Sequence, residues 1–284
     1  MTTILVTGAT GQVGRRFVPR LARWAGADSV RVLVRDEARA AALAALGVRV
    51  VVGDLRDPAD RARALRGAEA VVNVAAALRG VPDEEAYAVN RDAAVALGRD
   101  AARAGVRRFV QTSTNLVYGG GAGRPAVESD PLRPAPEWGA YARSKAQAEA
   151  GLGELGGELP LVVVRLAFVY GEGDPHLAQS LRWAAHWPSH RRLPVVHHAD
   201  AGQALWRALS TPGIEGRTYN AADDAPITAY DLHEIHGAPQ PAGAAERELA
   251  DPWDGQVSTA LIRRDLGWRP LHPSVRAAAE AGAL

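Results

Sequence analysis

The chain has 284 residues with 33 basic and 32 acidic side chains, so its net charge at neutral pH is +1. This length suits one large α/β domain or a main domain carrying a smaller one, and the balanced charge gives no reason to expect nucleic acid or a membrane as partner. The lack of cysteine excludes disulfides, thiolate catalysis and cysteine-ligated metal. With no apolar run of membrane-spanning length, we expect a cytoplasmic protein.

The first two-thirds of the chain alternates short β-branched runs with helix-forming stretches. This pattern predicts strands at 4–7, 30–34, 48–52, 70–74, 109–112 and 161–166, and helices at 13–24, 38–46, 59–65, 84–104 and 141–155. Continuous apolar strands that alternate with helices are typical of a parallel sheet covered on both faces. The predicted fold class is therefore α/β, with a doubly wound parallel sheet of Rossmann type.

Beyond residue 170 the pattern becomes irregular, and prolines separate short elements. We predict a dinucleotide-binding Rossmann domain over 1–170 and a smaller, substrate-covering domain over 171–284. The apolar segment 195–210 is expected to return to the main domain.

A glycine-rich turn follows the first predicted strand and precedes the first predicted helix. Glycines at such a turn let the main chain approach a pyrophosphate, whose charge is stabilised by the N-terminus of the helix. We therefore predict a dinucleotide site here, although glycines that only relieve strain in a turn are the alternative. The predicted contacts in the turn are Gly8, Thr10, Gly11, Gln12, Val13 and Gly14.

Arg35 ends the second predicted strand, at the position whose residue type differs between NAD-binding and NADP-binding proteins. An acidic residue there binds the ribose hydroxyls of NAD, whereas an arginine suits the 2′-phosphate of NADP. We predict NADP, with NAD as the alternative because Asp36 could take the acidic role if the register shifts by one. Asp54 is expected to accept a hydrogen bond from the adenine amino group, or else to cap the following helix.

Lys145 is the only lysine in the chain, and it stands four residues after Tyr141, so both side chains lie on one helical face. A tyrosine hydroxyl, with a pKa of about 10, exchanges protons poorly at neutral pH. A nearby ammonium favours the phenolate and makes the tyrosine a usable acid and base. A hydroxyl from Thr112-Ser-Thr114, at a strand end, could hold the substrate oxygen.

Together these motifs resemble the extended branch of the short-chain dehydrogenase/reductase superfamily, the NAD(P)-dependent epimerase/dehydratase family. Further matches are Asn73-Val-Ala-Ala76, Tyr-Ala-Val-Asn90 and Arg165-Leu-Ala-Phe-Val-Tyr-Gly171. The resemblance implies Thr114, Tyr141 and Lys145 as catalytic residues, with Ser113 in place of Thr114 if the register is shifted. The further cofactor contacts that it implies are Leu55, Ala75, Asn90, Thr112, Tyr141, Lys145 and Phe168.

Two departures from the family narrow the expected chemistry. Asn115-Leu116 stand where sugar dehydratases carry an Asp-Glu pair, and Phe168 stands where many nucleotide-sugar enzymes place an asparagine. We therefore predict hydride transfer between NADP(H) and an alcohol or carbonyl on a small molecule, with Tyr141 as general acid and base. An NAD-retaining sugar 4-epimerase-like enzyme is one alternative, and an NADP(H)-sensing regulatory protein without turnover is another.

Two further expectations concern partners. The helices at 84–104 and 141–155 resemble the pair through which family members dimerise, so a homodimer is one expectation and ordinary sheet-covering helices are the other. The histidines match no standard metal-ligand spacing, so no metal site is predicted.

Overall fold

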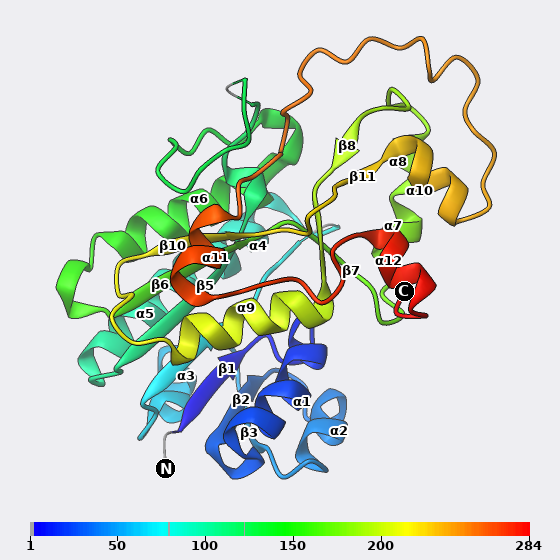
Figure 1. Ribbon diagram of the computed structural model, residues 1–284. Helices are drawn as coiled ribbons and strands as arrows, with labels where there is room; N and C mark the ends of the chain where they lie inside the picture. Colours follow the sequence, from blue (N-terminus) through cyan, green and yellow to red (C-terminus); the bar gives the residue numbers. More distant parts are fainter. Residues whose placement is uncertain (1–2, 79, 122) are drawn as a thin grey trace.

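A computed structural model describes residues 3–78, 80–121 and 123–284. Its centre is a seven-stranded sheet in the order β10-β6-β5-β4-β1-β2-β3, with every neighbouring pair parallel (Figure 1). The strands are β1 (Ile4–Thr7), β2 (Val30–Val34), β3 (Arg49–Val52), β4 (Ala70–Asn73), β5 (Arg108–Thr114), β6 (Leu161–Leu166) and β10 (Thr218–Ala221). This is the strand order of the Rossmann fold, so the predicted fold class is confirmed.

Helices cover both faces of the sheet because both faces are apolar. Along β1, Ile4 and Val6 join the core under α1 (Gly14–Ala25), α9 (His198–Ser210) and α11 (Ala260–Leu266), whereas Leu5 points to the opposite face. That second face packs against α3 (Pro58–Leu65), α5 (Ala94–Arg103) and α6 (Gly139–Gly153). None of the described helices has the length and apolarity needed to cross a bilayer.

The predicted strands at 4–7, 30–34 and 161–166 have the observed bounds of β1, β2 and β6. The predicted helix at 38–46 is shorter, a 3₁₀ turn at Ala38–Ala40 followed by α2 (Ala41–Ala44). The predicted helix at 84–104 is divided into α4 (Asp83–Tyr87), a π-helical segment (Ala88–Ala93) and α5. α4 and α5 lie beside α6 on one face of the sheet, and pairing of these helices with a second chain stays a prediction.

A smaller C-terminal part lies to one side of the sheet, at the upper right of Figure 1, and has its own apolar core around Tyr170, Leu232 and Val275. It holds a parallel strand pair and an antiparallel strand pair. Its elements are β7 (Phe168–Tyr170), α7 (His176–Gln179), α8 (Leu181–Ala184), β8 (Arg192–Leu193), β9 (Val195–His197), β11 (Ile227–Thr228), α10 (Ala229–Ile235) and α12 (Val275–Glu280).

The chain passes between the two parts more than once. Within segment 195–210, β9 pairs with β7 in the smaller part, whereas α9 packs against α1, β5 and β6. β10 lies in the range expected for the smaller domain, yet it pairs with β6 at the edge of the main sheet. Its sequence, Thr-Tyr-Asn-Ala, has a single β-branched residue, which is why no strand is predicted there. The domain boundary at residue 170 stays a prediction, and β10 belongs to the main sheet although it follows that boundary.

Candidate active site

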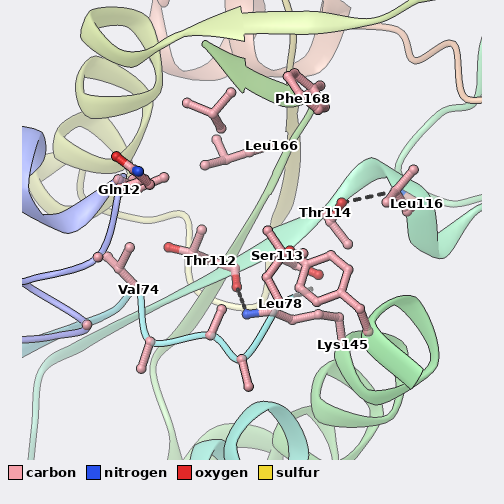
Figure 2. Close-up of a pocket in the computed structure, with 18 of the residues that line it drawn as sticks. Gln12, Val74, Leu78, Thr112, Ser113, Thr114, Leu116, Lys145, Leu166 and Phe168 are labelled. Atoms are coloured by element: carbon pink, nitrogen blue, oxygen red, sulfur yellow. Dashed lines mark hydrogen bonds between the residues drawn. The ribbon is translucent and has the colours of Figure 1, made fainter. Parts of the chain in front are cut away.

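A cavity of about 640 Å³ opens where the carboxyl ends of the parallel strands meet. Thr7 of β1, Val34 of β2, Thr112 of β5 and Leu166 of β6 all line it, and Figure 2 shows side chains from several of these strand ends converging on it. β1 lies between β2 and β4, so the strand order reverses here. Open α/β sheets bind their ligands at this switch point, which agrees with the predicted dinucleotide site.

The glycine-rich turn brings bare main chain to the cavity. A Cβ added at Gly8, whose φ is +68°, would lie 2.5 Å from the amide nitrogen of Ala75, and one at Gly14 would lie 2.1 Å from the Gly8 carbonyl oxygen. These two glycines are therefore needed for packing within the protein. A Cβ at Gly11 would meet the Gly8 carbonyl oxygen at 3.3 Å, so this residue is much less confined and leaves room in the cavity for a ligand.

The first turn of α1 fits an anionic group. No described side chain caps this helix end, and its first turn holds no acidic residue. Main-chain N–H groups at such an end attract phosphate. Thr10, Gln12 and Val13 line the cavity beside it, and Arg16 donates from Nη1 to Gln12 Oε1 over 2.8 Å, which fixes the Gln12 side chain. The residues present thus fit the pyrophosphate of a dinucleotide.

The end of the cavity beside β2 carries positive charge. Arg35 lines it, as predicted, and so does Arg39, which donates to the Thr10 carbonyl oxygen over 3.2 Å. The Asp36 carboxylate instead accepts the amide of Ala38 over 2.9 Å, and Asp36 is absent from the described cavity wall. The sequence analysis missed Arg39, because it lies in the 3₁₀ turn after β2 and beyond the strand end at which the cofactor preference is read.

Asp54 and Leu55 follow β3 and both line the cavity. The Asp54 carboxylate forms an ion pair with Arg56, 2.6 Å from Oδ2 to Nη2, and hydrogen bonds from Arg56 lower the pKa of Asp54. The carboxylate is therefore a charged acceptor at the cavity edge, and its contact with an adenine amino group stays a prediction.

Asn90 lies behind the cavity wall. Its Oδ1 accepts the amide of Ala77, and its Nδ2 donates to the Ala77 carbonyl oxygen, each over 2.8 Å, and to Ser144 Oγ over 3.1 Å. The side chain is fully buried in the π-helical segment, so it fixes the loop from Ala75 to Ala77, which does line the cavity. Asn90 is absent from the described cavity wall, and its direct contact with the cofactor stays a prediction.

Tyr141 and Lys145 lie in the first turns of α6, and both line the cavity together with Thr114. Lys145 is 2% exposed, and its Nζ donates to the Thr112 carbonyl oxygen over 3.1 Å, as Figure 2 shows. Burial lowers the pKa of Lys145 to about 8, and the negative charge of Glu149 partly opposes this effect. The lysine is therefore an ammonium at neutral pH, within the part of the cavity where Tyr141 lies.

The structure separates the two candidate hydroxyls of β5. Successive side chains of a strand point to opposite faces. The Ser113 hydroxyl donates to Glu149 and is thereby engaged within the protein, whereas Thr114 Oγ1 accepts the Leu116 amide over 3.3 Å and keeps its own hydrogen for another partner (Figure 2). Thr114 therefore suits the predicted catalytic hydroxyl better than Ser113. The buried Thr112 Oγ1, at the same cavity wall, has no hydrogen-bond partner among the described residues.

Beyond Phe168, the cavity wall comes from the smaller C-terminal part, where apolar side chains are mixed with charged ones such as Asp174 and Arg192. Trp187 and Leu193 line it, and Arg191 lies over the Trp187 ring at 4.8 Å. The Arg191 guanidinium is paired with Asp254 over 2.6 Å, so its charge is already balanced. The sequence analysis missed Arg191 and Asp254, because they are 63 residues apart in irregular segments.

The pKa of Lys145 predicts how activity responds to pH. As pH rises through about 8, the buried ammonium loses its proton and stops favouring the phenolate of Tyr141. We expect kcat/KM for carbonyl reduction to be level below this pH and to fall above it, measured in buffers of constant ionic strength. A rate that stays level to pH 10 would contradict a charged Lys145 in catalysis.

The cavity has a helix end suited to phosphate on one side, and Tyr141 with the buried Lys145 ammonium on the other. These features define a class of enzyme. The protein is an NAD(P)-dependent enzyme of the extended short-chain dehydrogenase/reductase type, and a nicotinamide dinucleotide is its cofactor.

Comparison with known proteins gives the family. The model of the NAD dependent epimerase/dehydratase family matches residues 4–222, and the chain belongs to this family. It is 32% identical over 245 residues to a dTDP-4-dehydrorhamnose reductase of Mycobacterium tuberculosis, across 80% of this chain and 72% of the reductase. It is 31% identical over 268 residues to the ceramide reductase of Caulobacter vibrioides, across 91% of this chain and 76% of that reductase. The UDP-glucose 4-epimerase of Thermus thermophilus, solved in complex with NAD, is 27% identical, with a TM-score of 0.74 over 95% of this chain and 94% of that one.

Proposed function

We propose that this protein transfers a hydride between NADP(H) and a carbonyl or carbinol carbon of a small molecule that is released as product. The observation that carries the proposal is that Thr114, Tyr141 and Lys145 line one cavity with the glycine-rich turn. The curated relatives of Mycobacterium and Caulobacter, both named as reductases, support the same chemistry.

Each of the three catalytic residues has its own role in this reaction. The bound cofactor supplies or accepts the hydride. The Thr114 hydroxyl donates a hydrogen bond to the substrate oxygen and orients the reacting carbon. Tyr141 gives its proton to that oxygen during reduction and takes it back during oxidation. The Lys145 ammonium, anchored on the Thr112 carbonyl oxygen, favours the phenolate form of Tyr141.

The charge beside β2 supports NADP as the cofactor. Arg35 and Arg39 border that end of the cavity, where a 2′-phosphate would sit, and the Asp36 carboxylate is engaged by the Ala38 amide. Guanidinium groups bind phosphate through paired, charge-assisted hydrogen bonds. An NAD site would instead need a carboxylate directed at the ribose.

Arg35→Ala tests this assignment. We expect the variant to lose about 1.5–3 kcal/mol of NADPH binding, the usual effect of a charge-assisted bond, and little NADH binding. Parallel fluorescence titrations with both cofactors measure the difference. Arg23→Ala, which removes an exposed arginine of α1, is the matched control and should change neither affinity. Equal losses for NADPH and NADH, or no loss, would contradict the NADP assignment.

A sugar 4-epimerase that retains NAD is the second candidate, supported by the likeness to the Thermus epimerase–NAD complex. In that case NAD stays bound through purification, and no reduced cofactor appears in solution during turnover. Net release or consumption of NADPH with a carbonyl substrate would favour the reductase. The balanced charge of Arg191 supports a substrate without a diphosphate, whereas Arg192 at the same wall would suit one that carries a diphosphate.

A further inference from the structure

A buried ion pair lies behind the cavity, between α6 and the end of β6. The Arg165 guanidinium donates to the Glu149 carboxylate through Nε, 3.1 Å from each oxygen, and through Nη2, 2.6 Å from Oε2. The two side chains are only 5% and 7% exposed. Desolvation of a buried pair largely cancels its attraction, so the stability of the fold alone does not account for two charges here.

The pair is tied to the strand that carries the catalytic hydroxyl. The Ser113 hydroxyl donates to Glu149 Oε1. Ser113 stands between Thr112, whose carbonyl oxygen accepts Lys145 Nζ, and Thr114. α6 therefore holds the end of β5 at two neighbouring points, through the Lys145 contact and the Glu149 contact.

Glu149 follows Lys145 by one helical turn and Tyr141 by two, so all three share one face of α6. Within the described ranges, Glu149 is the charged side chain that acts on the Lys145 ammonium, and it opposes the loss of charge on burial. Ionisable groups nearby on α6, α4 and β6 are Tyr141, Arg143, Glu85, Tyr87 and Arg165, the last of these behind Glu149. The other elements packed against α6, and the start of α4, carry Asp83, Glu84, the exposed Arg91–Asp92 pair, Arg99, Asp100, Arg103, Arg108 and Glu137.

Arg165 is itself fixed from the other side. Its Nη1 donates to the Tyr118 hydroxyl over 2.5 Å and to the Glu128 carbonyl oxygen over 3.2 Å. The Tyr118 hydroxyl in turn donates to Asn220 Oδ1 of β10 over 2.8 Å. These contacts fix the position of the guanidinium, and it holds the Glu149 carboxylate there.

We propose that Glu149 is a positioning residue of the active site: through Ser113 it fixes the end of β5 against α6, and its carboxylate, one helical turn from Lys145 and paired with Arg165, acts on the Lys145 side chain. This rests on the proposed function, because Glu149 would influence catalysis through Lys145.

The single lysine makes the charge on Lys145 directly measurable. Protein labelled with ¹³C-lysine has one lysine side-chain signal, whose chemical shift against pH gives the titration midpoint without any substrate. We expect the wild type to titrate near pH 8. In Glu149→Gln the midpoint should fall by roughly one pH unit, because the attraction is lost and Arg165 is left unbalanced.

Two further variants separate this role from simple packing. Glu154→Gln removes a carboxylate exposed just beyond the end of the same helix and should leave the midpoint unchanged. Glu149→Leu with Arg165→Met replaces the pair by apolar side chains, a change that buried pairs often tolerate, and it should also lower the midpoint. If Glu149→Gln or the double variant folds and titrates at the wild-type midpoint, the proposal is overturned.

Kinetics completes the test. The pH above which kcat falls should move down with the lysine midpoint in Glu149→Gln, a shift that loss of stability alone does not cause. A lysine midpoint that moves in a protein without turnover would leave the role of Glu149 intact and refute the proposed function. Normal turnover with an unmoved midpoint would refute the role of Glu149 and leave the proposed function intact.

Discussion

Tyr141→Phe is expected to lower kcat roughly 10²–10⁴-fold, the usual contribution of a general acid and base, while NADPH binding stays near the wild-type value. The ring that lines the cavity is retained, and only the proton-carrying hydroxyl is removed. Steady-state rates with a panel of ketones and aldehydes, together with cofactor titration, measure both quantities.

Tyr230→Phe is the matched control, since that tyrosine is 51% exposed on α10. It also loses its phenolic hydroxyl, but without effect on the cavity. If Tyr141→Phe turns over at the wild-type rate, Tyr141 is not the acid and base. If wild type and variant both bind NADPH tightly and neither shows activity, a nucleotide-sensing regulator becomes the better description.

Gly14→Ala is expected to destabilise the fold by about 3–4 kcal/mol, because the new methyl group would meet the Gly8 carbonyl oxygen and the Ala9 main chain, neither of which can move aside. Urea unfolding followed by circular dichroism measures the free energy. We also expect cofactor binding to be lost, since relief of the overlap must displace the turn from α1.

Two other glycines serve as controls for this result. Gly153→Ala, at the end of α6, meets nothing within 4 Å and should leave stability equal or slightly higher. Gly11→Ala should keep the fold and weaken cofactor binding, because its methyl group projects toward the phosphate position. A Gly14→Ala protein as stable as Gly153→Ala would show that the turn is looser than its geometry indicates.

The sequence was most informative where chemistry and structure are local. β1, β2 and β6 are buried on both faces, so their β-branched runs are unambiguous, and the spacing of Tyr141 and Lys145 needs only one helical turn. The contacts of Asn90 with Ala77 and Ser144 were not predictable, because they join segments that only tertiary packing brings together. The ion pair of Arg191 with Asp254 joins irregular segments, and such partners become neighbours only through tertiary packing.

The edge position of β10 also constrains how this chain can be divided. A fragment ending at Tyr170 would lack both β10 and α9, which would leave the open edge of β6 unpaired and remove part of the apolar layer from one face. Unpaired strand edges promote association between molecules. We therefore expect the nucleotide-binding part to need these later elements in order to fold, so a different substrate-covering segment would have to be grafted into internal loops and could not replace the tail.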